Sequence, residues 1–227
     1  MLKLFLQKQT CVAFFPLHYL FRSACCHYLT ATVSTFGAKV NNVVGYFYHI
    51  KVVFNYQYFL KKYQEYINDY ADTYAYCLLG NHFHLLIRVK DELPSPALTN
   101  FESLSKLDTH QIVSRQFKNL FIAYTLAFNK QQNRNGTLFQ TPFKRCLVDN
   151  DIYFTRLIFY IHANPQTHGI CDDFTEYKWS SYGSVLSEKI SNLKRKEVID
   201  WFYGKEGFIN FHKENRKLSE IEYLMIE

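Results

Sequence analysis

Two apolar runs within residues 76–89, each rich in strand-forming residues, flank polar Gly80-Asn81, a pattern that predicts two antiparallel strands joined by a turn. Successive side chains of a strand point to opposite faces, so the second strand has one apolar face. That face is made of Phe83, Leu85, Ile87 and Val89. His82 and His84 share the other face, where two imidazoles are potential metal ligands. An isolated pair of this kind is more often just two polar residues on a solvated face.

The same reading along the chain predicts an alternation of strands and helices. The predicted elements are a strand at 46–53, a helix at 56–68, the hairpin, a long helix from Asp108 or Thr109 to about residue 133, a strand at 145–148 and a helix at 149–163 ended by Asn164-Pro165. Strand-helix-strand repeated twice predicts an α+β fold, the ferredoxin-like split β-α-β antiparallel sheet with two helices on one face. The last helix is then the natural cover for the open face with the histidines.

This last predicted helix carries its own polar stripe. At about 100° per residue, Tyr160 and Asn164 are neighbours, beside an apolar face made of Phe154, Ile158 and Ile161. Laid over the open face of the sheet, the stripe would bring a phenol and an amide oxygen to the two imidazoles. The structural alternatives are an amphipathic core tyrosine and an asparagine that ends the helix before Pro165.

The chain divides into three parts by pattern. Residues 1–44 show no clear periodicity and stay unassigned, whereas residues 45–184 contain the predicted domain. Residues 185–227 form a helical C-terminal tail with short charged helices near 193–202 and 207–216. A length of 227 residues and a hydrophobic content of 48% suit one main domain rather than disorder.

Composition narrows the partners only slightly. The net charge of +6 permits a polyanionic partner without requiring one, and the 18 tyrosines and 21 phenylalanines suit either a core or platforms for unpaired bases. The six cysteines form no C-x-x-C pair, which favours a reducing compartment. Because the apolar stretch 12–21 is too short to span a bilayer, we expect a cytoplasmic protein with no membrane partner.

Four segments in this order resemble the REP-associated tyrosine transposases, which belong to the single-tyrosine branch of the HUH (His-hydrophobic-His) nucleases. The segments are YAYCLLGNHFHLL at 74–86, LFQTPFKR at 138–145, YIHANP at 160–165 and WSSY at 179–182. The resemblance covers about residues 54–216. It implies a DNA transposase that cleaves and rejoins single-stranded or hairpin DNA through a covalent 5′-phosphotyrosine.

The resemblance also implies the roles of four residues. Tyr160 matches the nucleophile, His82 and His84 match the ligands of a divalent metal, and Asn164 stands where relatives carry a third ligand. A phenol with a pKa of about 10 is a poor nucleophile for an anionic phosphodiester, so Mg²⁺ or Mn²⁺ is expected to neutralise and orient the phosphate. Imidazole ligands suit Mn²⁺ better, although phosphate oxygens and water can complete a Mg²⁺ shell.

Basic side chains near these motifs are candidate contacts for the DNA backbone. They are Lys130, Arg134, Lys144 and Arg145, together with Arg88, which shares the histidine face and could instead pair with an acid. The chain is expected to act as a monomer or homodimer. It lacks the longer loop that relatives have between their first strand and first helix. Two alternatives therefore stay open: a metal-dependent nuclease that uses water, and a catalytically silent DNA-binding relative.

Overall fold

The computed structural model describes residues 10–11, 40–46, 56–94, 108–139, 144–148 and 151–222 of the chain. Its strands are β1 (Thr10–Cys11), β2 (Val40–Tyr46), β3 (Ala71–Leu78), β4 (His82–Val89) and β5 (Lys144–Leu147). Its helices are α1 (Tyr56–Ile67), α2 (Thr109–Gln131), α3 (Asp151–Thr167), α4 (Tyr182–Leu186), α5 (Arg195–Trp201), α6 (Lys205–Glu222) and the short 3₁₀ helix η2 (Phe174–Glu176).

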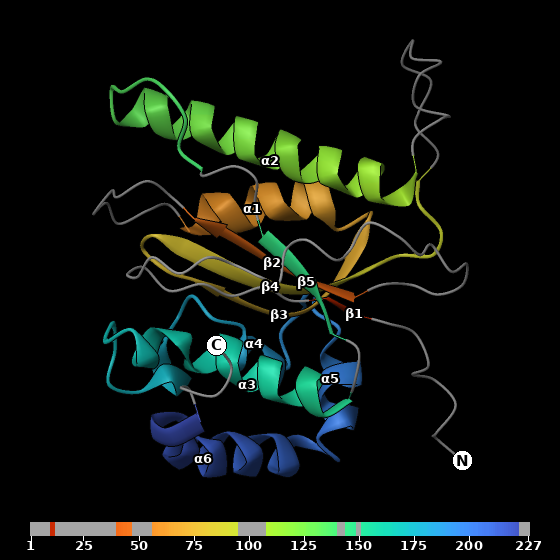
Figure 1. The fold of residues 1–227 in the computed structure, drawn as a ribbon, viewed down its shortest axis with the longest axis vertical. Coiled ribbons are helices and arrows are strands. Elements are labelled where there is room, and N and C mark those ends of the chain that lie inside the picture. The colour runs from red at the N-terminus through yellow and green to blue at the C-terminus, as the bar shows by residue number, and fades with distance from the viewer. Residues whose placement is uncertain are drawn as a thin grey trace, which may run out of the picture.

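The strands form one sheet in the order β1-β5-β2-β4-β3. β2 is antiparallel to both β4 and β5, and β3 is antiparallel to β4. Along the chain, α1 connects β2 to β3, and α2 connects β4 to β5. This strand order with these connections is the ferredoxin-like split β-α-β arrangement. The predicted fold class is therefore confirmed. Helices α1 and α2 cover one side of the sheet, and α3 to α6 lie on the other (Figure 1).

The first strand of the repeated unit lies earlier than predicted. We expected it at 46–53, whereas β2 spans Val40–Tyr46, and residues 47–55 lie outside the described part of the chain. Its sequence, VNNVVGY, contains asparagine and glycine, which are depleted in strands. Pairing with strands on both sides and burial of Val43, which is 2% exposed, outweigh that weak propensity. Residues from the unassigned 1–44 segment therefore enter the sheet.

The core between the sheet and the first two helices follows the predicted pattern. The α1 side chains Phe59, Tyr63 and Ile67 are buried. The predicted apolar stripe of α2 is buried too, as are Phe83, Leu85, Ile87 and Val89 of β4. Asp108 is the N-cap of α2: its side chain accepts a 2.8 Å hydrogen bond from Gln111 N, and the Gln111 side chain accepts one from Asp108 N.

The core on the other side of the sheet includes the C-terminal helices. Phe154, Ile158 and Ile161 of α3 are buried there. Val198 of α5 and Phe208 of α6 belong to the same cluster of buried side chains. The region predicted as a helical tail is thus packed into the core that holds α3 in place.

The WSSY segment, which the sequence left irregular, runs along the outer edge of β3. Leu78 N donates to the carbonyl of Trp179 at 2.9 Å, and Ser181 N donates to the carbonyl of Tyr76 at 2.9 Å. The Ser181 hydroxyl also accepts a 2.8 Å hydrogen bond from Tyr76 N. These contacts cover the sheet edge, which would otherwise expose backbone donors and acceptors.

Two further features bear on the expected cellular setting. Cys77 and Cys171 are free thiols. In the described ranges, none of the helices combines the length and the apolar character that crossing a bilayer requires.

Candidate active site

Helix α3 covers the histidine face of the sheet and extends one turn beyond its predicted end. Pro165 lies inside the helix, where it removes only one hydrogen bond near the C-terminus. The carbonyl of Asn164 still accepts a 3.0 Å helical bond from His168 N. Asn164 therefore does not end the helix, and its side chain is 1% exposed in the layer between α3 and the sheet.

The four residues predicted from the motifs meet between β4 and α3. The ring centres of His82 and His84 are 5.0 Å apart, and those of His84 and Tyr160 are 5.6 Å apart. His82 Nε2 lies 3.4 Å from Asn164 Oδ1. Both imidazoles are buried, at 6% and 2% exposure. Residues separated by about eighty positions in the sequence thus form one polar cluster inside an apolar layer.

Asn81 orients the first imidazole of this cluster. His82 Nδ1 lies 2.7 Å from Asn81 Oδ1, a shorter contact than the one its Nε2 makes with Asn164 Oδ1, which favours the tautomer with the proton on Nδ1 and the lone pair on Nε2. Asn164 is oriented by a 3.5 Å contact from its Nδ2 to the carbonyl of Tyr160, which turns Oδ1 toward His82. In that tautomer, His82 Nε2 and Asn164 Oδ1 are both electron-pair donors, and they lie 3.4 Å apart. A cation fits this arrangement.

Both imidazoles are neutral near pH 7. Burial, assisted by the positive charge of a protonated His168, lowers the pKa of His82 to about 4. Burial and the neighbouring His82 hold the pKa of His84 well below its usual value. Asn164 opposes both shifts, because its amide oxygen favours positive charge at this point. Neutral imidazole is the form that binds a metal.

The donor set fits a divalent ion only when Asn164 is included. Within the described ranges, no three His, Cys, Asp or Glu side chains lie close enough together to hold a metal ion. Two imidazole nitrogens and one amide oxygen are the donors that the geometry provides. Such a set accepts Mn²⁺ readily and Mg²⁺ with further oxygen ligands.

Two residues of this cluster were missed by the sequence analysis. Asn81 was treated only as part of a turn, although it directly precedes His82. His168 lies with its ring centre 5.1 Å from that of His82. His168 comes four residues after Asn164, a spacing that would place both on the same side of a helix. We did not use this spacing, because the helix was expected to end at Pro165.

Arg88 lies on the histidine face but is held by acids. Its guanidinium donates to Asp72 Oδ2 at 2.8 Å and lies 3.7 Å from Glu197 Oε2. Lys194 approaches the same two carboxylates at 3.4 Å. Arg88 is thus paired with acids, as one of the two alternatives from the sequence had it. Its contact with DNA stays a prediction.

The other predicted phosphate contacts are not gathered at the histidines. Lys130 lies in the last turn of α2, and Arg134 follows that helix. α2 itself is on the opposite side of the sheet from α3 (Figure 1). Arg134 donates to the carbonyl of Thr137 at 3.2 Å. Lys144 and Arg145 pair with β2 through their backbones, and their side chains lie outside the described part of the structure. A role in DNA binding stays a prediction for all four.

Comparison with known proteins gives one distant structural similarity. The sequence matches no protein-family model, and it matches no curated protein. Among solved structures, the chain is similar to a REP-associated tyrosine transposase bound to a REP hairpin. The identity is 14%, the match covers 66% of this chain and 79% of that chain, and the TM-score is 0.49.

Proposed function

We propose that this protein is a DNA strand transferase that cuts and rejoins single-stranded or hairpin DNA, with Tyr160 as the nucleophile. The observation that carries the proposal is the meeting of Tyr160 and Asn164 on α3 with His82 and His84 on β4. The 3.4 Å approach of His82 Nε2 to Asn164 Oδ1 supports a cation site there, since both atoms can donate electron pairs when His82 carries its proton on Nδ1. The motifs that resemble the REP-associated tyrosine transposases contain the same residues.

The proposed reaction exchanges one ester bond for another. The Tyr160 oxygen forms a bond to the scissile phosphorus, and the bond from phosphorus to the 3′ oxygen breaks. The phenol proton passes to solvent, and the departing 3′ oxygen takes up a proton. The 5′ phosphate remains on Tyr160, which conserves the bond energy for rejoining. A bound Mg²⁺ or Mn²⁺ would neutralise the phosphate and align it with the phenol.

The chain's own residues account for the rigidity that this reaction needs. His82 and His84 sit on a strand paired on both sides, and Asn164 is buried in a helix packed on the same sheet. Asn81 holds the tautomer of His82. The reacting phosphate can therefore bind to groups that are already oriented, which lowers the entropic cost of alignment.

Hairpin DNA labelled separately at its two ends tests the proposal. In the presence of Mn²⁺, the 3′-end label should appear in a covalent protein–DNA adduct on a denaturing gel, and the 5′-end label should appear in a free fragment. Tyr160→Phe should abolish the adduct, because the nucleophilic oxygen is removed. Tyr153→Phe, on the same helix, is the matched control and should retain it.

Metal-site variants and the alternative functions give distinct results. His82→Ala or His84→Ala should remove metal-stimulated cleavage while the protein stays folded by circular dichroism. Cleavage without an adduct would favour a nuclease that uses water. Binding without cleavage would favour a silent DNA-binding protein. A fully active Tyr160→Phe variant would refute the assignment.

A further inference from the structure

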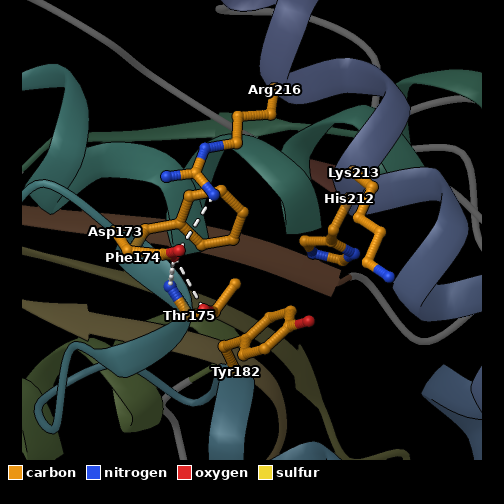
Figure 2. A pocket seen from close by; sticks show the side chains of 7 residues that line it. All are labelled: Asp173, Phe174, Thr175, Tyr182, His212, Lys213 and Arg216. Carbon is orange, nitrogen blue, oxygen red and sulfur yellow. Dashed lines mark hydrogen bonds and ion pairs between the residues drawn. The ribbon is translucent and has the colours of Figure 1, made fainter.

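A small cavity lies between α6 and residues 173–182, on the far side of α3 from the sheet. Its volume is about 170 Å³. Lys213 and Arg216 line it from α6, and Phe174 and Tyr182 line it from the facing segment (Figure 2). Pockets for drug-sized ligands measure about 300–1,000 Å³, so this cavity suits a small chemical group.

The hydroxyl of Tyr182 is directed into this cavity. The residue is only 7% exposed, and its oxygen points toward the side on which Lys213 lies (Figure 2). Among the residues that the structure describes, none forms a hydrogen bond with this oxygen. Burial and the nearby Asp173 raise the pKa of Tyr182, so the hydroxyl keeps its proton near pH 7. A buried donor of this kind needs an acceptor from water or from a ligand.

The charges around the cavity leave one cation unmatched. Arg216 donates to Asp173 Oδ2 at 2.9 Å, and Asp173 Oδ1 accepts from Thr175 N at 2.9 Å and from Thr175 Oγ1 at 2.7 Å. Arg216 and Asp173 therefore balance each other. Within the described ranges, Lys213 has no acidic partner. The lining thus presents a positive charge beside a buried hydrogen-bond donor.

One wall of the cavity touches the part of α3 that carries the candidate nucleophile. The rings of Phe174 and Phe159 are packed edge to face with their centres 6.0 Å apart, and Phe159 directly precedes Tyr160. The chain leaves α3 after Thr167 and reaches Asp173 six residues later. The cavity is therefore close to the helix from which Tyr160 would act on DNA.

We propose that this cavity binds a phosphate group, which accepts hydrogen bonds from the Tyr182 hydroxyl and the Lys213 ammonium. This inference rests on the function proposed above, because a phosphodiester backbone is the oxyanion that the proposed reaction brings to α3. The phosphate supplies the acceptor that Tyr182 lacks and the negative charge that matches Lys213. A backbone phosphate of DNA and a free phosphate ion offer the same chemistry.

The affinity of the full-length protein for single-stranded DNA, measured at several salt concentrations, tests this inference. Tyr182→Phe keeps the buried ring but removes the donor, so it should weaken binding roughly tenfold. Lys213→Gln should lower the slope of log affinity against log salt concentration by about 1. The matched controls are Tyr203→Phe, whose ring is 99% exposed, and Lys189→Gln, on an exposed loop. Both should bind DNA as the wild type does.

Inorganic phosphate distinguishes the two sources of the group. At constant ionic strength, it should raise the unfolding temperature of the wild type and of Tyr160→Phe, but not that of Tyr182→Phe. Loss of this effect with unchanged DNA affinity would assign the cavity to free phosphate, whereas loss of DNA affinity would assign it to the backbone. If Tyr182→Phe and Lys213→Gln match the wild type in both measurements, the phosphate site is overturned and the role of Tyr160 stands. A wild type that shows the phosphate effect but forms no adduct would overturn the role of Tyr160 and leave the phosphate site in place.

Discussion

At the scale of single residues, a second pair of histidines forms a buried chain of hydrogen bonds whose direction is set by its ends. The carbonyl of Phe208 accepts from His212 Nδ1–H at 2.8 Å, so His212 Nε2 accepts from His162 Nδ1–H at 3.0 Å. His162 Nε2 then accepts from the Ser181 hydroxyl at 2.8 Å. All donors and acceptors are matched while both rings are neutral. The chain links α3 and α6 to the WSSY segment.

This arrangement predicts a loss of stability in mild acid. Burial lowers the pKa of His212 to about 4, below the value of about 6.5 expected in the unfolded chain. The unfolded state therefore binds more protons between these values, and the free energy of unfolding falls as pH drops from 6.5 toward 4. His212→Gln keeps an acceptor for His162 but does not titrate. Between pH 7 and pH 4.5, we expect it to lose about 2–3 kcal/mol less than the wild type.

Urea unfolding at the two pH values measures this difference. Asp173, Lys213 and Arg216 line the pocket beside His212 and remain in both proteins, so their contribution cancels (Figure 2). An equal loss of stability in the wild type and in His212→Gln would show that His212 is not the group responsible.

At the scale of elements, the end of α3 depends on a glycine that no other residue replaces without strain. A Cβ at Gly169 would meet no atom within 4 Å, so its requirement is the positive φ of +64° alone. The left-handed conformation costs an alanine roughly 1–2 kcal/mol. This turn follows His168, whose ring centre lies 5.1 Å from that of His82.

Two glycine-to-alanine substitutions should change stability in opposite directions. Gly169→Ala should lower the free energy of unfolding by about 1 kcal/mol, because of the positive φ. Gly183→Ala, in α4, also meets no atom within 4 Å but has no positive φ, so it should raise that free energy by about 0.5 kcal/mol. Urea unfolding of both variants checks the signs. A stabilised Gly169→Ala would contradict the left-handed backbone conformation at Gly169.

At the scale of the whole molecule, the sheet that carries His82 and His84 has a hydrophobic core on each of its two sides. α1 and α2 pack on one side of the sheet, and α3 packs on the other together with α5 and α6. Phe208 of α6 is fully buried and contacts His212, with a ring-centre distance of 4.2 Å. The C-terminal helices therefore support the helix that carries Tyr160.

Truncation of one buried ring tests this integration. Phe208→Ala should lower the free energy of unfolding by about 3–5 kcal/mol, the cost of a large cavity in a core. Ile152→Ala, at a position of α3 that is 67% exposed, is the control and should change it by less than about 0.5 kcal/mol. Chemical denaturation measures both. A cost below about 1 kcal/mol for Phe208→Ala would mean that the C-terminal helices dock only loosely.

The hairpin and helix faces were predictable, because a short stretch of sequence sets them. The alternation at Phe83, Leu85 and Ile87 indicates which side of β4 packs against α1 and α2, although the other side is buried as well. The strand β2 was not predictable, since its asparagines and Gly45 favour no strand until neighbouring strands pair with it. The end of α3 was misplaced because Pro165 is a probable helix boundary in sequence, yet lies inside the last turns here.

By itself, the sequence determined the local geometry: which side chains of β4 face the core, and that Tyr160 and Asn164 are neighbours on a helix. Backbone geometry sets these directions within a few residues, so no distant contact is needed. Only the tertiary structure decided that His82 meets Asn164 at 3.4 Å, that His168 joins them, and that α5 and α6 belong to the core. Contacts between residues distant in sequence depend on how the helices and the sheet pack against one another, and the hydrophobic periodicity of a single segment does not specify that packing.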